Sequence, residues 1–249
     1  MAATERTSLR SGEGLDGIRN INVRHGFIQK VFGILAVQLT VTTAIAGYCC
    51  VYANKLMITN PTLVSTVLIL ATVVTLAMMF VFMCCPNTMR DYPTNYILLS
   101  IFTLAEAVVV GFVSSQYQVQ SVLMVLGITA VIVTTLMLFA CQTTYDFTGW
   151  MPYFVVFSMV LMCFGLLLSL SSLFGASGAA FDTLQLIYAG LGALLFSGYI
   201  VLDTQMIVGG AKNQKYKMSI DDYCMAAILL YVDIIQLFMF LLELFGNRR

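Results

Sequence analysis

Residues 229–242 read LLYVDIIQLFMFLL, an almost continuous apolar run with a single acid, Asp233, inside it. The run is part of a longer apolar segment, Tyr223 to Phe245, which exceeds the roughly 20 residues that an α-helix needs to cross the hydrocarbon core of a bilayer. An acid near the centre of such a helix costs roughly 2.5–3.5 kcal/mol on insertion scales. The stretch therefore predicts a transmembrane helix with a buried acid that needs a partner.

The rest of the chain has the same apolar character. Of its 249 residues, 60% are hydrophobic and only 10% are charged, whereas soluble domains carry about 25% charged residues. Short polar breaks separate seven apolar segments: Phe27–Tyr52, Thr62–Cys85, Asn95–Ser114, Gln120–Ala140, Pro152–Phe174, Leu184–Val208 and Tyr223–Phe245. We expect an all-α fold, a polytopic membrane protein with a seven-transmembrane-helix bundle, and the lipid bilayer as its partner.

The distribution of polar residues predicts the domain organisation, and the charge and metal-binding residues exclude several functions. Residues 1–26 predict a polar N-terminal tail, and residues 27–249 the transmembrane domain. The net charge of zero gives no case for a nucleic-acid partner. With a single histidine and no CxxC pair, a zinc site is not expected, and neither is any cofactor. Without a soluble catalytic domain, we expect no enzyme.

Basic residues predict the orientation of the bundle. With seven crossings, the tail and the even-numbered loops share one side, which carries Arg6, Arg10, Arg19, Arg24, Arg90, Lys212, Lys215 and Lys217. The other side carries Lys55, Arg248 and Arg249. The excess of positive charge places the N-terminus in the cytosol. The final arginine pair would suit the cytosol better, so a re-entrant last span remains the alternative.

Three acids fall well inside predicted spans: Glu106, Asp203 and Asp233. The last two lie on consecutive helices, each two to three turns from the connecting turn, so antiparallel packing would bring them to a similar depth. Gly192 shares the face of Asp203 and would let the two helices approach closely. Two carboxyl groups meeting at low dielectric would share a proton and titrate as a coupled pair. They would form either a pH sensor or a purely structural link between helices.

Several stretches resemble a known family: VRHGFIQKVFGILAVQLTVTT (23–43), YPTNYILLSIFTLAEA (92–107), CQTTYDFTGW (141–150), FSGYIVLDTQ (196–205) and DDYCMAAILLYVDIIQLFMFLLELFG (221–246). The chain resembles the transmembrane Bax inhibitor motif proteins, on the lifeguard branch. The resemblance implies two layers of helices around a central last helix. The di-aspartyl pH sensor of that family falls on Asp203 and Asp233. An arginine that partners the acids in some members has no evident equivalent here, and Arg90 is a candidate.

The function implied by the resemblance is a pH-sensitive calcium leak across an intracellular membrane, which suppresses cell death. Glu106, Asp203 and Asp233 are then the candidate ion-path residues, with Asp203 and Asp233 as transient calcium ligands and protons as the regulator. Glu106 has the alternative of a neutral acid hydrogen-bonded in the bundle. Endoplasmic reticulum or Golgi is the expected compartment, with the plasma membrane as the alternative.

Three other functions remain open on the sequence. The chain could be a non-conducting protein that acts through cell-death regulatory membrane proteins, or a proton/calcium exchanger. Two acids on adjacent spans are also needed by intramembrane aspartyl proteases. The pattern typical of those enzymes, YD with a later GxGD, is absent, which weighs against this class.

Overall fold

In the part of the chain that the structure describes, seven helices are long and apolar enough to cross a membrane. The computed structural model describes residues 2–209 and 218–248, and for residues 2–22, 53–55 and 86 the backbone alone. The elements are α1 (Ala2–Thr59), α2 (Pro61–Cys84), η1 (Pro86–Met89), α3 (Thr94–Ser115), α4 (Val119–Gln142), η2 (Phe147–Trp150), α5 (Met151–Leu173), α6 (Ala179–Val208), η3 (Ile220–Asp222) and α7 (Tyr223–Phe245). The all-α prediction is confirmed.

Two helix starts differ from the predicted spans by more than one residue. Helix α1 begins at Ala2 and so includes the stretch expected as a polar tail, while the division into residues 1–26 and 27–249 stays a prediction. Helix α6 begins at Ala179, five residues before the predicted Leu184. Its first turn holds Asp182, and an acid at a helix N-terminus is favoured by the helix dipole. Hydropathy alone misses such a polar first turn.

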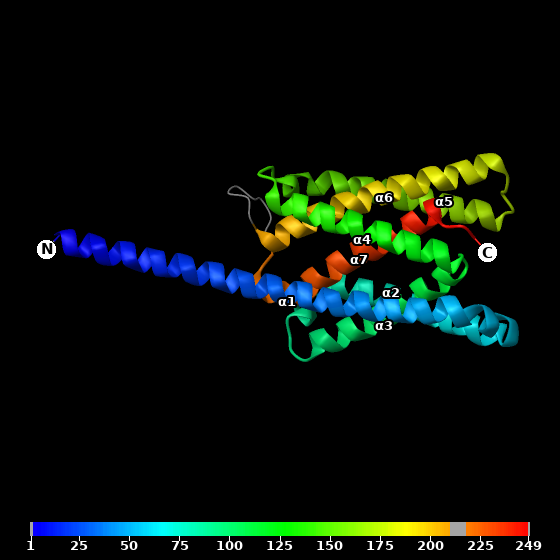
Figure 1. Ribbon diagram of the computed structural model, residues 1–249, viewed down its shortest axis with the longest axis horizontal. Helices are drawn as coiled ribbons and strands as arrows, with labels where there is room; N and C mark the ends of the chain where they lie inside the picture. The colour runs from blue at the N-terminus through cyan, green and yellow to red at the C-terminus, as the bar shows by residue number, and fades with distance from the viewer. Residues whose placement is uncertain (1, 210–217, 249) are drawn as a thin grey trace.

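Helix α7 lies between two layers of helices, α1–α3 on one side and α4–α6 on the other (Figure 1). It packs against α1, α3, α4 and α6. In its most apolar stretch 72% of the residues are buried, a larger share than in any other described span. The prediction of a central last helix is therefore confirmed.

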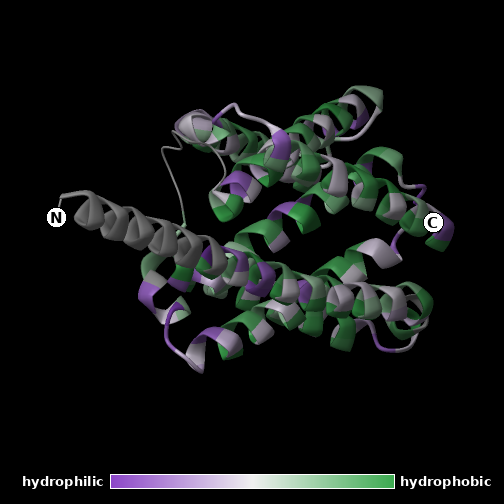
Figure 2. Cartoon of the chain, turned by 60° about the vertical axis from the view of Figure 1, so that its left-hand side comes forward, coloured by the Kyte–Doolittle hydropathy of each residue, from purple (hydrophilic) through white to green (hydrophobic). Residues whose placement is uncertain are grey.

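The outer helices present apolar side chains to the surroundings. Leu76 and Phe80 on α2, and Leu167 and Leu173 on α5, are more than half exposed. Figure 2 shows hydrophobic residues along the sides of the bundle and hydrophilic residues mainly in loops and at helix ends. An exposed apolar surface of this extent requires lipid around it. The chain is a multi-pass integral membrane protein.

The C-terminus lies at the end of the bundle opposite to the N-terminus (Figure 1). There the backbone N–H of Gln118 donates to the carbonyl of Asn247 at 2.9 Å, beside the start of α4. The N–H of Asn247 donates to Ser121 Oγ at 3.3 Å. Helix α7 thus runs through the whole bundle, and the re-entrant alternative for the last span is wrong.

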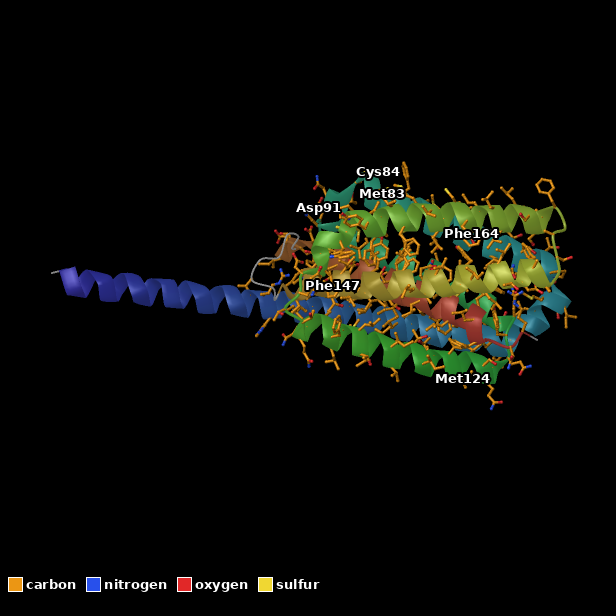
Figure 3. All side chains as sticks on the ribbon, turned by 90° about the horizontal axis from the view of Figure 1, so that it is seen from above. Met83, Cys84, Asp91, Met124, Phe147 and Phe164 are labelled. Carbon is orange, nitrogen blue, oxygen red and sulfur yellow. The ribbon has the colours of Figure 1, made fainter. Side chains whose placement is uncertain are left out.

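Not every basic residue used to predict the orientation is described. Lys212, Lys215, Lys217 and Arg249 lie outside the described residues, as do the side chains of Arg6, Arg10, Arg19 and Lys55. Of the two that bear on the candidate site, Arg24 belongs to α1 and Arg90 follows η1. The α2–α3 connection near Arg90 also carries Asp91, and Figure 3 shows Asp91 toward the end of the bundle where α1 enters.

Close packing of α6 on α7 depends on Gly192. A Cβ atom added there would lie 2.5 Å from Cζ of Phe240 on α7, which is closer than side chains tolerate. The Phe240 ring is itself fixed by Phe196, with ring centroids 5.8 Å apart, and by Tyr188, at 5.5 Å. The predicted role of this glycine in helix approach is confirmed by that contact.

We expect Gly192→Val to destabilise the protein by about 1–3 kcal/mol, the usual cost of overpacking a filled core. Gly190→Val on the same helix is the matched control, because a Cβ there would meet nothing within 4 Å. The measurement is the midpoint of thermal unfolding of each purified variant in the same detergent. Equal midpoints for the two variants would contradict the close approach.

Candidate functional site

The structure places the two acids of the last helices side by side. Asp203 on α6 is 5% exposed and Asp233 on α7 is 7% exposed. Their side chains lie within hydrogen-bonding reach of each other. A carboxylate only accepts hydrogen bonds, so a hydrogen bond between the two groups needs one of them to be protonated. The arrangement is therefore suited to sharing a proton between the central helix and its neighbour.

The pair is incompletely bonded. Among the described residues, no hydrogen-bond partner reaches the buried Asp233 Oδ2, nor Oγ1 of Thr204, the residue after Asp203. Tyr199 lies one turn before Asp203 and close enough to both acids to interact with their charge. Its hydroxyl hydrogen-bonds with Ser158 of α5 at 2.9 Å. Buried polar atoms are nearly always paired. This carboxyl oxygen is thus available for a further polar contact.

Glu106 does not join the pair. It is buried on α3 beside Thr75 of α2, and it lies electrostatically close to Tyr231 of α7. The Tyr231 hydroxyl hydrogen-bonds with Thr42 of α1 at 2.8 Å. Residues two apart on a helix point about 200° away from each other, so Tyr231 and Asp233 use opposite faces of α7. The three predicted ion-path acids are therefore split into a pair and a separate acid on the other side of the central helix.

The described residues contain no group of three or more His, Cys, Asp or Glu side chains that could hold a metal ion. Calcium takes six to eight oxygen ligands. The two carboxyl groups of Asp203 and Asp233 supply at most four oxygen atoms. They offer contacts for an ion in passage and do not by themselves make a complete coordination shell.

Arg24 caps the end of α6, and sequence reasoning missed it. Its guanidinium donates to the carbonyls of Met206 at 2.7 Å, of Ile207, and of Met218 at 2.9 Å. The last carbonyls of a helix lack partners within the helix, and a cation at that end also favours the helix dipole. Since the last turn of α6 has no basic residue, the cap comes from another helix. The absence of a basic residue from the last turn of α6 is the one sign in the sequence that a cap has to come from another helix.

Arg90 does not contact the acid pair, which corrects the prediction made for it. Its guanidinium Nε lies 2.6 Å from Asp222 Oδ1, in an exposed ion pair. The hydrogen bond and the negative charge of Asp222 raise the pKa of the Arg90 guanidinium. The position of Arg90 in the α2–α3 connection places it at the surface end of α7, more than two turns from Asp233.

Further contacts fix the same end of α7. The ammonium of Lys30 on α1 lies 3.3 Å from the centroid of the Tyr223 ring, a cation–π contact. The amide of Asn95 on α3 donates to the Tyr223 hydroxyl at 2.9 Å. Together with Arg24 and the Arg90–Asp222 pair, these contacts hold the two ends of the α6–α7 connection against α1 and α3.

The chain is similar to known membrane proteins over almost its whole length. Residues 24–249 match the family model described as "Inhibitor of apoptosis-promoting Bax1". The chain is 37% identical over 245 residues to protein lifeguard 3 of Mus musculus, covering 97% of this chain and 74% of that protein. It is 36% identical over 227 residues to protein lifeguard 3 of Homo sapiens, covering 91% and 70%. It is 34% identical over 228 residues to protein LIFEGUARD 3 of Arabidopsis thaliana, covering 90% and 85%.

We expect Arg24→Ala to destabilise the protein by about 1.5–3 kcal/mol, because three carbonyls lose hydrogen bonds to a charged donor. Amides in the last turn of α6 should also exchange with solvent faster. Arg24→Lys should recover only part of the loss, because one ammonium cannot reproduce the fork of the guanidinium. Thermal unfolding and hydrogen exchange measure the two effects.

Arg90→Ala is the control for this experiment. Its ion pair is exposed and screened by salt, so its effect on stability should be much smaller and should fade at high ionic strength. A loss of stability in Arg24→Ala no larger than in Arg90→Ala would show that the cap is unimportant.

Proposed function

Because the chain belongs to the Bax inhibitor motif family, which is linked to inhibition of apoptosis, we propose that it suppresses cell death by leaking calcium from an intracellular store. The leak responds to pH, and the Asp203–Asp233 pair is its gate. The observation that carries this proposal is the buried contact between the two acids, which links α6 to the central helix α7.

The shared proton explains how pH would act on the gate. With one proton, a carboxyl group donates to a carboxylate, and such charge-assisted bonds are about twice as strong as neutral ones. A second proton at acid pH leaves two neutral groups and a weaker bond. Loss of the only proton leaves two adjacent negative charges that repel at low dielectric. The family resemblance favours uptake of the second proton. Acid then weakens the bond between Asp203 and Asp233, and α6 moves away from α7.

The ion path would use the same groups. Carboxylate oxygens are the ligands that calcium prefers, and Asp233 Oδ2 has no hydrogen-bond partner in the part of the chain that the structure describes. Asp203 and Asp233 would contact the ion transiently once the helices separate. Glu106 lies on the far face of α7, so we assign it no part in this gate and keep it as a separate buried acid.

Family membership also suggests the orientation of the protein and the membrane in which it acts. We infer that the N-terminus is cytosolic, which puts Arg24 and Arg90 on the cytosolic side, in agreement with the positive-inside rule. The membrane would be that of the endoplasmic reticulum or Golgi, where a leak lowers stored calcium. Membrane proteins that regulate cell death are the expected partners, and no enzymatic step is required.

The test is calcium flux from liposomes that contain the purified protein, measured from pH 5 to 8 for the wild type and for Asp233→Asn. Asparagine keeps the size of aspartate but cannot take up a proton in this range. A gate that opens on binding one proton changes its open fraction by up to about tenfold per pH unit. We expect this dependence in the wild type and a flat profile in the folded mutant.

Glu106→Gln is the matched control, because it neutralises an equally buried acid outside the pair. It should keep the pH response. A wild-type flux that needs an opposing proton gradient would identify an exchanger instead of a channel. No flux above that of empty liposomes would defeat the leak and favour a non-conducting protein that acts through partners.

A further inference from the structure

A cavity of about 330 Å³ lies between α1 and α4, separate from the polar surroundings of the acid pair. Its two walls belong to different layers of the bundle, and residues of the central helix α7 form its floor (Figure 1). The floor residues are Ile234, Ile235 and Phe238, all less than 10% exposed. At this place the central helix is therefore reached from the side through a gap between the layers.

The lining of the cavity is apolar and carries no charged residue. Of the four threonines on its walls, three have hydroxyl groups that donate within their own helices. The hydroxyls of Thr129 and Thr134 donate to carbonyls one turn earlier in α4, and the hydroxyl of Thr42 donates to the carbonyl of Gln38. Such a lining suits neither an ion nor a chain of water molecules, both of which need free polar partners.

The length of the cavity matches a hydrocarbon chain. Its α4 wall extends from Val119, the first residue of that helix, to Thr134. At 1.5 Å per residue this is about 22 Å, compared with about 30 Å for the whole hydrocarbon core. The cavity thus starts at the membrane edge where α3 connects to α4 and passes beyond the depth of one leaflet.

An apolar cavity of about 150 Å³ in a protein stays dry and binds small hydrocarbons. The cavity between α1 and α4, at about 330 Å³, is roughly twice that size. The chemistry that fits is a single flexible apolar chain, and the surrounding bilayer supplies it.

We propose that this cavity binds one acyl chain of a bilayer lipid, which enters between α1 and α4 from the leaflet on the side of the α3–α4 connection. The acyl chain fills the gap above Ile234, Ile235 and Phe238 and completes the packing of the central helix. Ile234 follows Asp233 in the sequence, so the bound chain also excludes water from this side of α7. The site does not depend on the proposed calcium leak.

Photolabelling of the full chain tests the site. The protein is reconstituted into phosphatidylcholine vesicles that contain a phosphatidylcholine with a diazirine on one acyl chain, irradiated, and mapped by peptide mass spectrometry. We expect labelling of the cavity residues Leu126 and Ile235 to exceed, several-fold, that of Met159 and Val160, which are 60% exposed on α5 and report ordinary lipid contact.

Two glycine variants give a matched comparison. Gly47 lines the cavity and Gly127 does not, yet a Cβ at either position would meet nothing within 4 Å, so a side chain can leave the backbone at both without a clash. Gly47→Leu places a side chain in the cavity and should abolish the excess labelling of Leu126 and Ile235. Gly127→Leu should leave it unchanged. The proposal would be overturned if the wild type showed no excess labelling of Leu126 and Ile235, or if the excess persisted in Gly47→Leu.

Discussion

The hydrocarbon core of a bilayer offers no hydrogen-bond partners, so each polar group inside this bundle has to find one within the protein. This constraint explains the main polar contacts. Asp203 lies within hydrogen-bonding reach of Asp233, the Thr42 hydroxyl hydrogen-bonds with Tyr231, and the Gln38 amide donates to Thr103 at 2.9 Å. Each contact joins two different helices. The buried polar groups therefore position the helices relative to one another, which apolar packing against equally apolar lipid does only weakly.

Helix α7 combines these contacts because its different faces serve different neighbours. Asp233 connects it to α6, and Tyr231, on the opposite face, connects it to α1. Ile234 and Phe238 lie toward the cavity between α1 and α4. The two layers meet largely through this one helix, so a shift of α7 relative to α6 would also disturb its contacts with the other layer. A change in one shared proton thus has a structural route to the whole bundle.

Much of this arrangement could be predicted from the sequence, for reasons that differ from residue to residue. The spans follow from hydropathy, and the meeting of Asp203 with Asp233 follows from antiparallel neighbours joined by a short connection. The face of Glu106 could not be predicted, because hydropathy does not determine the lateral order of helices. Arg24 was missed because its partners are backbone carbonyls up to 194 residues away, which leave no side-chain pattern. Arg90 was misassigned because the acid it pairs with, Asp222, lies at the surface end of α7.

Arg24 and the acid pair lie close together along the last turns of α6, which bears on the proposed gate. Asp203 lies one turn before Met206 and Ile207, whose carbonyls Arg24 caps. On the proposed path, a cation that left the pair toward this end would approach the positive charge of the guanidinium and be repelled by it. Passage would then require the end of α6 to move away from α1, which is the helix that carries Arg24. If α6 separates from α7 as proposed, the acid pair and the arginine cap are both loosened by displacement of the same helix. Proton uptake at the pair would then open the barrier that Arg24 forms.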